Sequence, residues 1–109
     1  MNRISSKQAK AHAITGEVKR IVFHRDGGLC VYCKRAGSPE AHYIPRSKGG
    51  LGIEENILTL CRECHDKFDR KIPIPAKERE GMKEFFQDYL KSHYPDWDES
   101  KLIYRKGML

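Results

Sequence analysis

Residues 30–65 of the chain read CVYCKRAGSPEAHYIPRSKGGLGIEENILTLCRECH. The segment contains the same short motif twice, once as Cys30-x2-Cys33 and once as Cys61-x2-Cys64, with 27 residues between the two copies. Two residues between cysteines let both sulfurs turn toward one point about 2.3 Å away, and two such motifs complete a tetrahedron of thiolates. We therefore expect all four cysteines to hold one structural zinc ion.

Two disulfides or four inert buried thiols are the alternatives for the same cysteines. The basic start of the chain lacks a hydrophobic signal segment, which disfavours disulfides, and a thioredoxin-like redox pair would need one motif rather than two. The gap exceeds the roughly 15 to 20 residues of common zinc ribbons, which indicates an inserted unit. Because four thiolates leave zinc no open position, any chemistry has to come from other residues, in or beside that insertion.

The insertion and the residue after it carry an ordered set of polar residues. His42 precedes Tyr-Ile-Pro-Arg-Ser-Lys-Gly-Gly, Asn56 lies within Glu-Asn-Ile, and His65 directly follows Cys64. Over about residues 17–70 this combination resembles the HNH nuclease family with a four-cysteine zinc site. The resemblance implies an α+β fold, a small zinc-braced ββα-metal (His-Me finger) domain with flanking helices. It also implies a metal-dependent endonuclease that hydrolyses DNA phosphodiester bonds, of a kind often encoded by bacteria or their phages.

The resemblance also implies a role for each of these three residues. His42 corresponds to the general base, and a neutral imidazole suits that task because it titrates near working pH. Asn56 corresponds to the residue that pins the loop and orients the base, and that reaches the metal in some members. His65 corresponds to a ligand of a catalytic divalent cation, magnesium or manganese.

One position departs from the family pattern. Members usually have Asp or His immediately before the base, as a metal ligand, whereas this chain has Ala41, which cannot coordinate a metal. Asp69 lies four residues after His65, on the same face of a helix, and is a second metal candidate, with Glu40 as a further one. We expect looser metal binding, a preference for manganese, or loss of the catalytic ion.

Composition and charge fit a small domain that meets a polyanion. The chain has 109 residues and a formal net charge of +6, and residues 1–35 hold eight Lys and Arg against two acids. This distribution predicts an attractive surface for DNA near the N-terminal segment. Arg46 and Lys48, in the glycine-rich loop after the base, are candidates for phosphate contacts. No apolar run approaches the roughly 18 residues of a membrane span, and a cytoplasmic protein is expected.

Local patterns divide the chain into three expected parts. Residues 1–15 form a flexible basic segment, 16–72 the zinc-bound core, and 73–109 an amphipathic helix and tail that pack on the core. The expected elements are a helix over 17–26, strands over 29–32 and 41–44, a flexible loop over 46–52, an extended run over 57–60, a short helix over 64–70, and a helix whose core stripe is Met82, Phe85, Phe86, Tyr89 and Leu90.

Two other functions fit the same residues. A zinc-braced module of this fold would bind DNA without cutting it, and the missing ligand at Ala41 favours that alternative. A protein-interaction zinc module would have no need of His42. For the nuclease, a homodimer would let two single-site units cut both strands.

Overall fold

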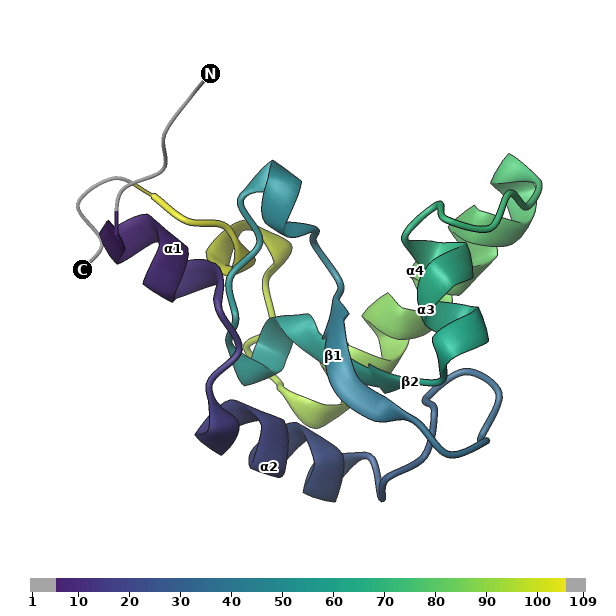
Figure 1. Ribbon diagram of the computed structural model, residues 1–109, viewed down its shortest axis with the longest axis horizontal. Helices are drawn as coiled ribbons and strands as arrows, with labels where there is room; N and C mark the ends of the chain where they lie inside the picture. The colour runs from purple at the N-terminus through teal and green to yellow at the C-terminus, as the bar shows by residue number, and fades with distance from the viewer. Residues whose placement is uncertain (1–5, 106–109) are drawn as a thin grey trace.

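The computed structural model describes residues 6–105, and these form an α+β fold in which helices surround a two-stranded antiparallel sheet (Figure 1). The elements are α1 (Ser6–His12), α2 (Gly16–Arg25), β1 (Ser38–His42), β2 (Ile57–Leu60), α3 (Arg62–Phe68) and α4 (Ala76–His93), with short 3-10 helices at Arg46–Lys48, Glu54–Asn56 and Glu99–Leu102. Each helix within this range is too short or too polar to cross a membrane.

The sheet and α3 make up the expected ββα unit. β1 pairs with β2 so that Ala41 lies opposite Leu58 and His42 opposite Ile57. All four residues of β2 are buried, as the apolar run over 57–60 predicts for a strand covered on both faces. Cys61 directly follows β2 and caps α3, because its sulfur accepts a hydrogen bond from the Cys64 amide. The zinc motif therefore fixes where strand turns into helix.

The long helix α4 closes the core against α3. Met82, Phe86 and Leu90 are fully buried, as their helical spacing predicts. The ring of Phe86 meets that of Phe68 edge to face at 4.9 Å. Phe85 is an exception to the expected stripe: it is 42% exposed and packs edge-on against Tyr32 at the surface.

An ion pair at the end of α2 ties that helix to the rest of the core. Arg25 and Asp26 pair at 2.7 Å with almost no exposed side-chain surface. Asp26 also accepts hydrogen bonds from the Thr59 amide and the Tyr89 hydroxyl, and Arg25 donates to the main chain of Ile57. Because these partners satisfy both charges, the pair joins α2, β2 and α4 without leaving an uncompensated ion.

The predicted strand over 29–32 is wrong. Leu29 makes a single bridge to Ala36, and the chain between them turns sharply, with the Cys30 amide bonded to the Arg35 carbonyl at 2.6 Å. An extended strand would send neighbouring side chains to opposite faces, whereas two cysteines aimed at one point require a turn. The other predicted strand, over 41–44, lies earlier in the structure, at Ser38–His42.

Within the segment 1–15, which the sequence predicts to be flexible, the structure contains helix α1. Helix α1 packs on the loop after β1, where the Gly52 amide donates to the Ala11 carbonyl at 2.8 Å and His12 is buried. Residues 1–5 of the expected segment 1–15, and 106–109 of the expected tail 73–109, lie outside the described residues.

The glycine-rich loop over 46–52 is held from two sides rather than free. Besides its contact with α1, its Leu51 amide donates to the Leu102 carbonyl, and the Tyr104 amide donates to the Gly49 carbonyl. Three of its residues form a short 3-10 helix. Figure 1 shows α1 and the yellow C-terminal segment side by side at this loop. Contacts that are distant in sequence thus supply the rigidity that the glycines lack.

Candidate functional site

The four cysteine sulfurs gather at one point, where the turn that precedes β1 meets the start of α3. They all lie within 4.8 Å of one another, and the Cys33 and Cys61 sulfurs are 3.5 Å apart. In a tetrahedral site, with each thiolate about 2.3 Å from zinc, neighbouring sulfurs are separated by a distance that lies between these two values. This donor set therefore fits a structural zinc site that braces the ββα unit, as the motif spacing predicts.

Nearby donors favour the thiolate form of Cys33, whereas burial raises the pKa of the Cys64 thiol. The Arg35 guanidinium lies 3.3 Å from the Cys33 sulfur and 3.6 Å from that of Cys61. Its hydrogen bond lowers the pKa of the Cys33 thiol to about 6. Main-chain amides of Cys33 and Cys64 also point at the first sulfur of each motif. Four thiolates around one divalent ion carry excess negative charge, which this cation and these amides offset.

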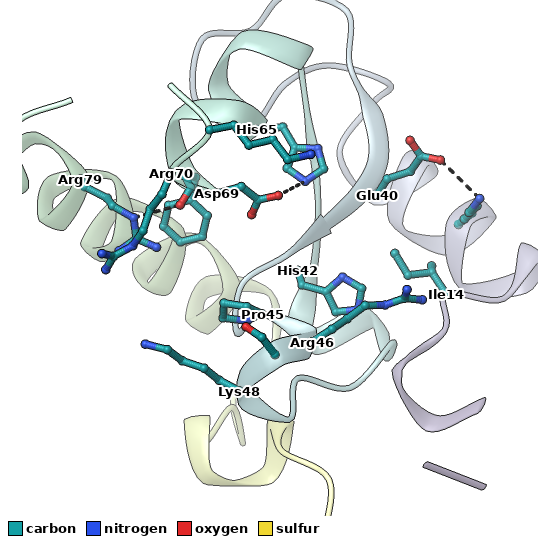
Figure 2. A pocket seen from close by; sticks show the side chains of 14 residues that line it. Ile14, Glu40, His42, Pro45, Arg46, Lys48, His65, Asp69, Arg70 and Arg79 are labelled. Atoms are coloured by element: carbon teal, nitrogen blue, oxygen red, sulfur yellow. Dashed lines mark hydrogen bonds and ion pairs between the residues drawn. The ribbon is translucent and has the colours of Figure 1, made fainter. Parts of the chain in front are cut away.

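A cleft of about 810 Å³ lies beside the zinc-braced unit and contains both candidate histidines. Its wall is formed by β1, by the loop after β1, by α3 with the turn that follows it, and by α2 and α4. Figure 2 shows His42 on one wall, with the His65 and Asp69 pair on the wall facing it. The two residues with the strongest expected roles therefore share one cavity.

Within residues 6–105, one hydrogen bond of the His42 side chain fixes the tautomer of its ring. Its Nε2 lies 2.9 Å from the main-chain oxygen of His12, and a carbonyl only accepts, so Nε2 is the protonated nitrogen of the neutral ring. Burial lowers the pKa of His42 below its ordinary value; the His12 carbonyl opposes this shift, and the charge of Arg46 adds to it. The imidazole is therefore neutral at pH 7, with the Nδ1 lone pair available.

His65 lies on α3, and Asp69 caps the C-terminal end of that helix, so the two side chains are one helical turn apart and form a pair. His65 Nε2 and Asp69 Oδ2 are 3.1 Å apart. Two neighbouring ligands of one octahedral ion, each about 2.1 Å from it, are separated by about 3 Å. This separation is that of a direct ion pair or hydrogen bond, and it is also compatible with two ligands of one divalent cation.

Asn56 lies outside the cleft wall and is fully buried beneath it. Its Oδ1 accepts from the Ile44 amide at 2.8 Å, and its Nδ2 donates to the carbonyls of Ile44 and Leu51. These bonds use its amide to tie the two ends of the glycine-rich loop together. The geometry fits a positioning role, and it gives no support to Asn56 as a metal ligand.

The strand alternation explains the departure at Ala41. Ala41 is fully buried in the hydrophobic core, whereas Glu40 and His42, two residues apart on β1, both line the cleft. The side chain that follows the pleat into the cleft is thus Glu40, which pairs with Lys19 at 3.5 Å. Its carboxylate lines the same cleft, but among the described residues it does not join His65 and Asp69 in a cluster close enough to hold one ion.

The cleft is strongly cationic. The predicted Arg46 and Lys48 both line it, and the sequence analysis missed four further cations: Lys19, Arg70, Lys71 and Arg79. Of these six cations, only Lys19 lies within the first 35 residues. The cations of the cleft therefore do not come from the N-terminal segment that holds the excess positive charge. The missed residues come from elements far apart in sequence. Of these four, only the adjacent Arg70 and Lys71 form a local pattern that could have indicated a basic surface.

Residues 30–79 match the family model described as HNH endonuclease. The matched range includes both cysteine motifs, His42, Asn56, His65 and Asp69, so it confirms the resemblance that these residues carry. No curated protein matches the chain.

Proposed function

We propose that this chain, which carries an HNH endonuclease segment over residues 30–79, is a metal-dependent endonuclease that hydrolyses DNA phosphodiester bonds. The observation that carries the proposal is the cleft in which His42 faces the His65 and Asp69 pair among six cations. A base, two metal-ligating groups and a positive surrounding are the parts that phosphodiester hydrolysis requires.

His42 is the general base of this proposal. Its Nδ1 accepts a proton from a water molecule as the water oxygen attacks phosphorus and the bond from phosphorus to the 3′ oxygen breaks. The products are a 5′-phosphate and, once the 3′ oxygen takes a proton from solvent, a 3′-hydroxyl. A base in this position contributes roughly 10² to 10⁴ in rate.

His65 and Asp69 are the proposed ligands of the divalent cation, and Glu40, which lies in the same cleft, would have to leave Lys19 to join them. When bound, magnesium or manganese supplies positive charge beside the scissile phosphate and the departing oxygen. Two protein ligands leave most of the ion's coordination to water and phosphate, which is the usual situation for magnesium. We expect binding weaker than in relatives with a ligand immediately before the base.

The cations around the cleft hold the phosphate backbone. Arg46 and Lys48 extend from the short 3-10 helix on one side, and Arg79 extends from α4 on the other. Such contacts fix the position of a strand without reading its bases, so we expect little sequence preference.

A plasmid assay tests the proposal. Purified protein is incubated with supercoiled DNA and magnesium or manganese, and wild type is compared with His42→Ala and with His24→Ala. His24 is an exposed histidine on α2 away from the cleft. We expect the His24 variant to cleave like wild type and the His42 variant to lose at least a hundredfold in rate.

The products and the controls separate the alternatives. Equal inactivity of wild type and His42→Ala under every metal, with DNA retained in a gel shift, would favour the non-catalytic DNA-binding module. Relaxed circles that precede linear DNA are expected of a single-site monomer, and direct linear product of a homodimer. Melting curves of all variants exclude unfolding as the cause of a loss.

A further inference from the structure

A second groove of about 590 Å³ continues from the cleft along the outer side of α3 and α4. It shares Lys48, Arg70 and Arg79 with the cleft, and it adds Lys67 and Lys83. Glu80 is the one acidic residue among those that line it. The two hollows are therefore one continuous basic surface, with three cations at the junction.

Arg70 stands at that junction in an unfavourable backbone conformation. Its φ is +67°, in the left-handed region, directly after the residue that caps α3. Helices commonly end on such a residue, but the residue is usually glycine, because a Cβ is disfavoured there. Arg70 is exposed, and no hydrogen bond of its side chain occurs within residues 6–105. For the backbone conformation alone, glycine would be more favourable than arginine at this position.

Arg79 is fixed at one end and open at the other. Its Nε donates to the Phe68 carbonyl at 2.9 Å, and its guanidinium lies over the Phe68 ring, 4.8 Å from the centroid. The two terminal nitrogens make no hydrogen bond within the described chain, 6–105, and lie where the cleft and the groove meet. A guanidinium held in this way is preorganised for an anion, since less side-chain freedom is lost on binding.

We propose that this groove binds the phosphates of the nucleic-acid strand that flank the scissile phosphate. Arg70 and Arg79 would receive the phosphate next to the cleft, and Lys83 one further along the groove. The inference rests on the proposed function, since it extends the substrate beyond the cleavage site. It concerns affinity and strand path rather than the chemical step.

Binding of duplex DNA to variants made in the His42→Ala background tests the groove without cleavage. Fluorescence anisotropy over a range of salt concentrations compares Arg70→Gly, Lys83→Gln and Lys77→Gln. Lys77 is the matched control, because it lies on the same helix as Lys83, is exposed, and lines neither hollow.

We expect Arg70→Gly to weaken binding roughly five- to tenfold at 0.1 M salt and to reduce the salt slope by about 0.9, as for one lost phosphate contact. Lys83→Gln should act in the same direction on a duplex that extends past the cleft, and Lys77→Gln should bind like its parent. The melting temperature of Arg70→Gly should equal or exceed that of the parent, because glycine relieves the backbone conformation.

The outcomes distinguish the groove from the proposed function. If the parent binds DNA but Arg70→Gly and Lys83→Gln match Lys77→Gln, the groove proposal is overturned and the cleft proposal stands. If the parent shows no salt-sensitive binding, DNA is not the substrate and both proposals fail. A loss of affinity together with a loss of thermal stability in Arg70→Gly would make Arg70 structural and would also overturn the groove.

Discussion

The imidazole of His42 donates from Nε2 to the main-chain oxygen of His12, at 2.9 Å and 30 residues away in sequence. The acceptor lies at the end of α1, and the His12 ring is itself held by the Gly50 carbonyl at 2.7 Å from Nδ1. The proposed base is thus oriented by a helix outside the range that matches the family model. Neutral His42 has its proton on Nε2, which leaves Nδ1 as the basic atom.

The first prediction concerns this tautomer. At pH 7.5 the ring of His42 should be in the Nε2–H form, which nitrogen chemical shifts in a long-range ¹⁵N–¹H correlation report directly. A chain that starts at residue 14 lacks the carbonyl and should show a mixture of tautomers and slower cleavage. Dominance of the Nδ1–H form in the full chain would contradict the structure.

The second prediction concerns the pKa of His42. Burial lowers it below the ordinary value of about 6.5, and the Arg46 charge adds to the lowering. An NMR titration of the free protein should place the midpoint below 6.5, and Arg46→Gln should move it upward. Because the folded pKa is depressed, the stability that neutral His42 contributes is complete above pH 6.5. It is lost as the pH falls through the folded pKa.

The third prediction is that metal removal unfolds the domain. A structural zinc site contributes about 10 to 16 kcal/mol of apparent binding free energy, against a net stability of roughly 5 to 15 kcal/mol for a whole domain. A strong chelator in reducing buffer should abolish the folded circular dichroism spectrum, and added zinc should restore it. Cys30→Ser should lower the melting temperature steeply, and retention of wild-type stability without metal would refute a structural zinc.

The fourth prediction uses two glycines in opposite surroundings. A Cβ at Gly52 would lie 2.0 Å from the Ala13 carbonyl oxygen, so Gly52→Ala should force α1 off the loop. We expect a lower melting temperature and a loss of DNA cleavage, because α1 carries the acceptor for His42. Gly81→Ala is the control: nothing lies within 4 Å of its added Cβ in α4, and it should stabilise the protein by about 0.5 to 1 kcal/mol.

Sequence reasoning succeeded where one local pattern carries the information. The two cysteine motifs predicted the four-sulfur cluster, since the spacing within each motif sets the direction of both side chains. The apolar run at Ile57–Leu60 predicted β2 with its bounds. The period of Met82, Phe86 and Leu90 predicted the buried face of α4.

Sequence reasoning failed where contacts between distant segments determine the structure. Nothing local in α1 predicts that His12 is buried against Gly50, because the partner lies 38 residues later. The strand predicted at 29–32 has suitable residue types, but the requirement that Cys30 and Cys33 face one point overrides propensity there. Arg70 and Arg79 enter the cleft only once α3 and α4 have packed, so segment charge could not locate the basic surface.

The contacts that hold the glycine-rich loop come from segments on both sides of the matched range. The Leu51 amide donates to the Leu102 carbonyl, and the Tyr104 ring packs beside that of His12. The loop beside His42 is therefore held both by α1 and by residues 102–104. A chain cut before residue 102 would keep both cysteine motifs, His42 and His65, but it would lose the Leu102 and Tyr104 contacts to the loop. The proposed activity therefore depends on residues 102–104, which lie well outside the range that matches the family model.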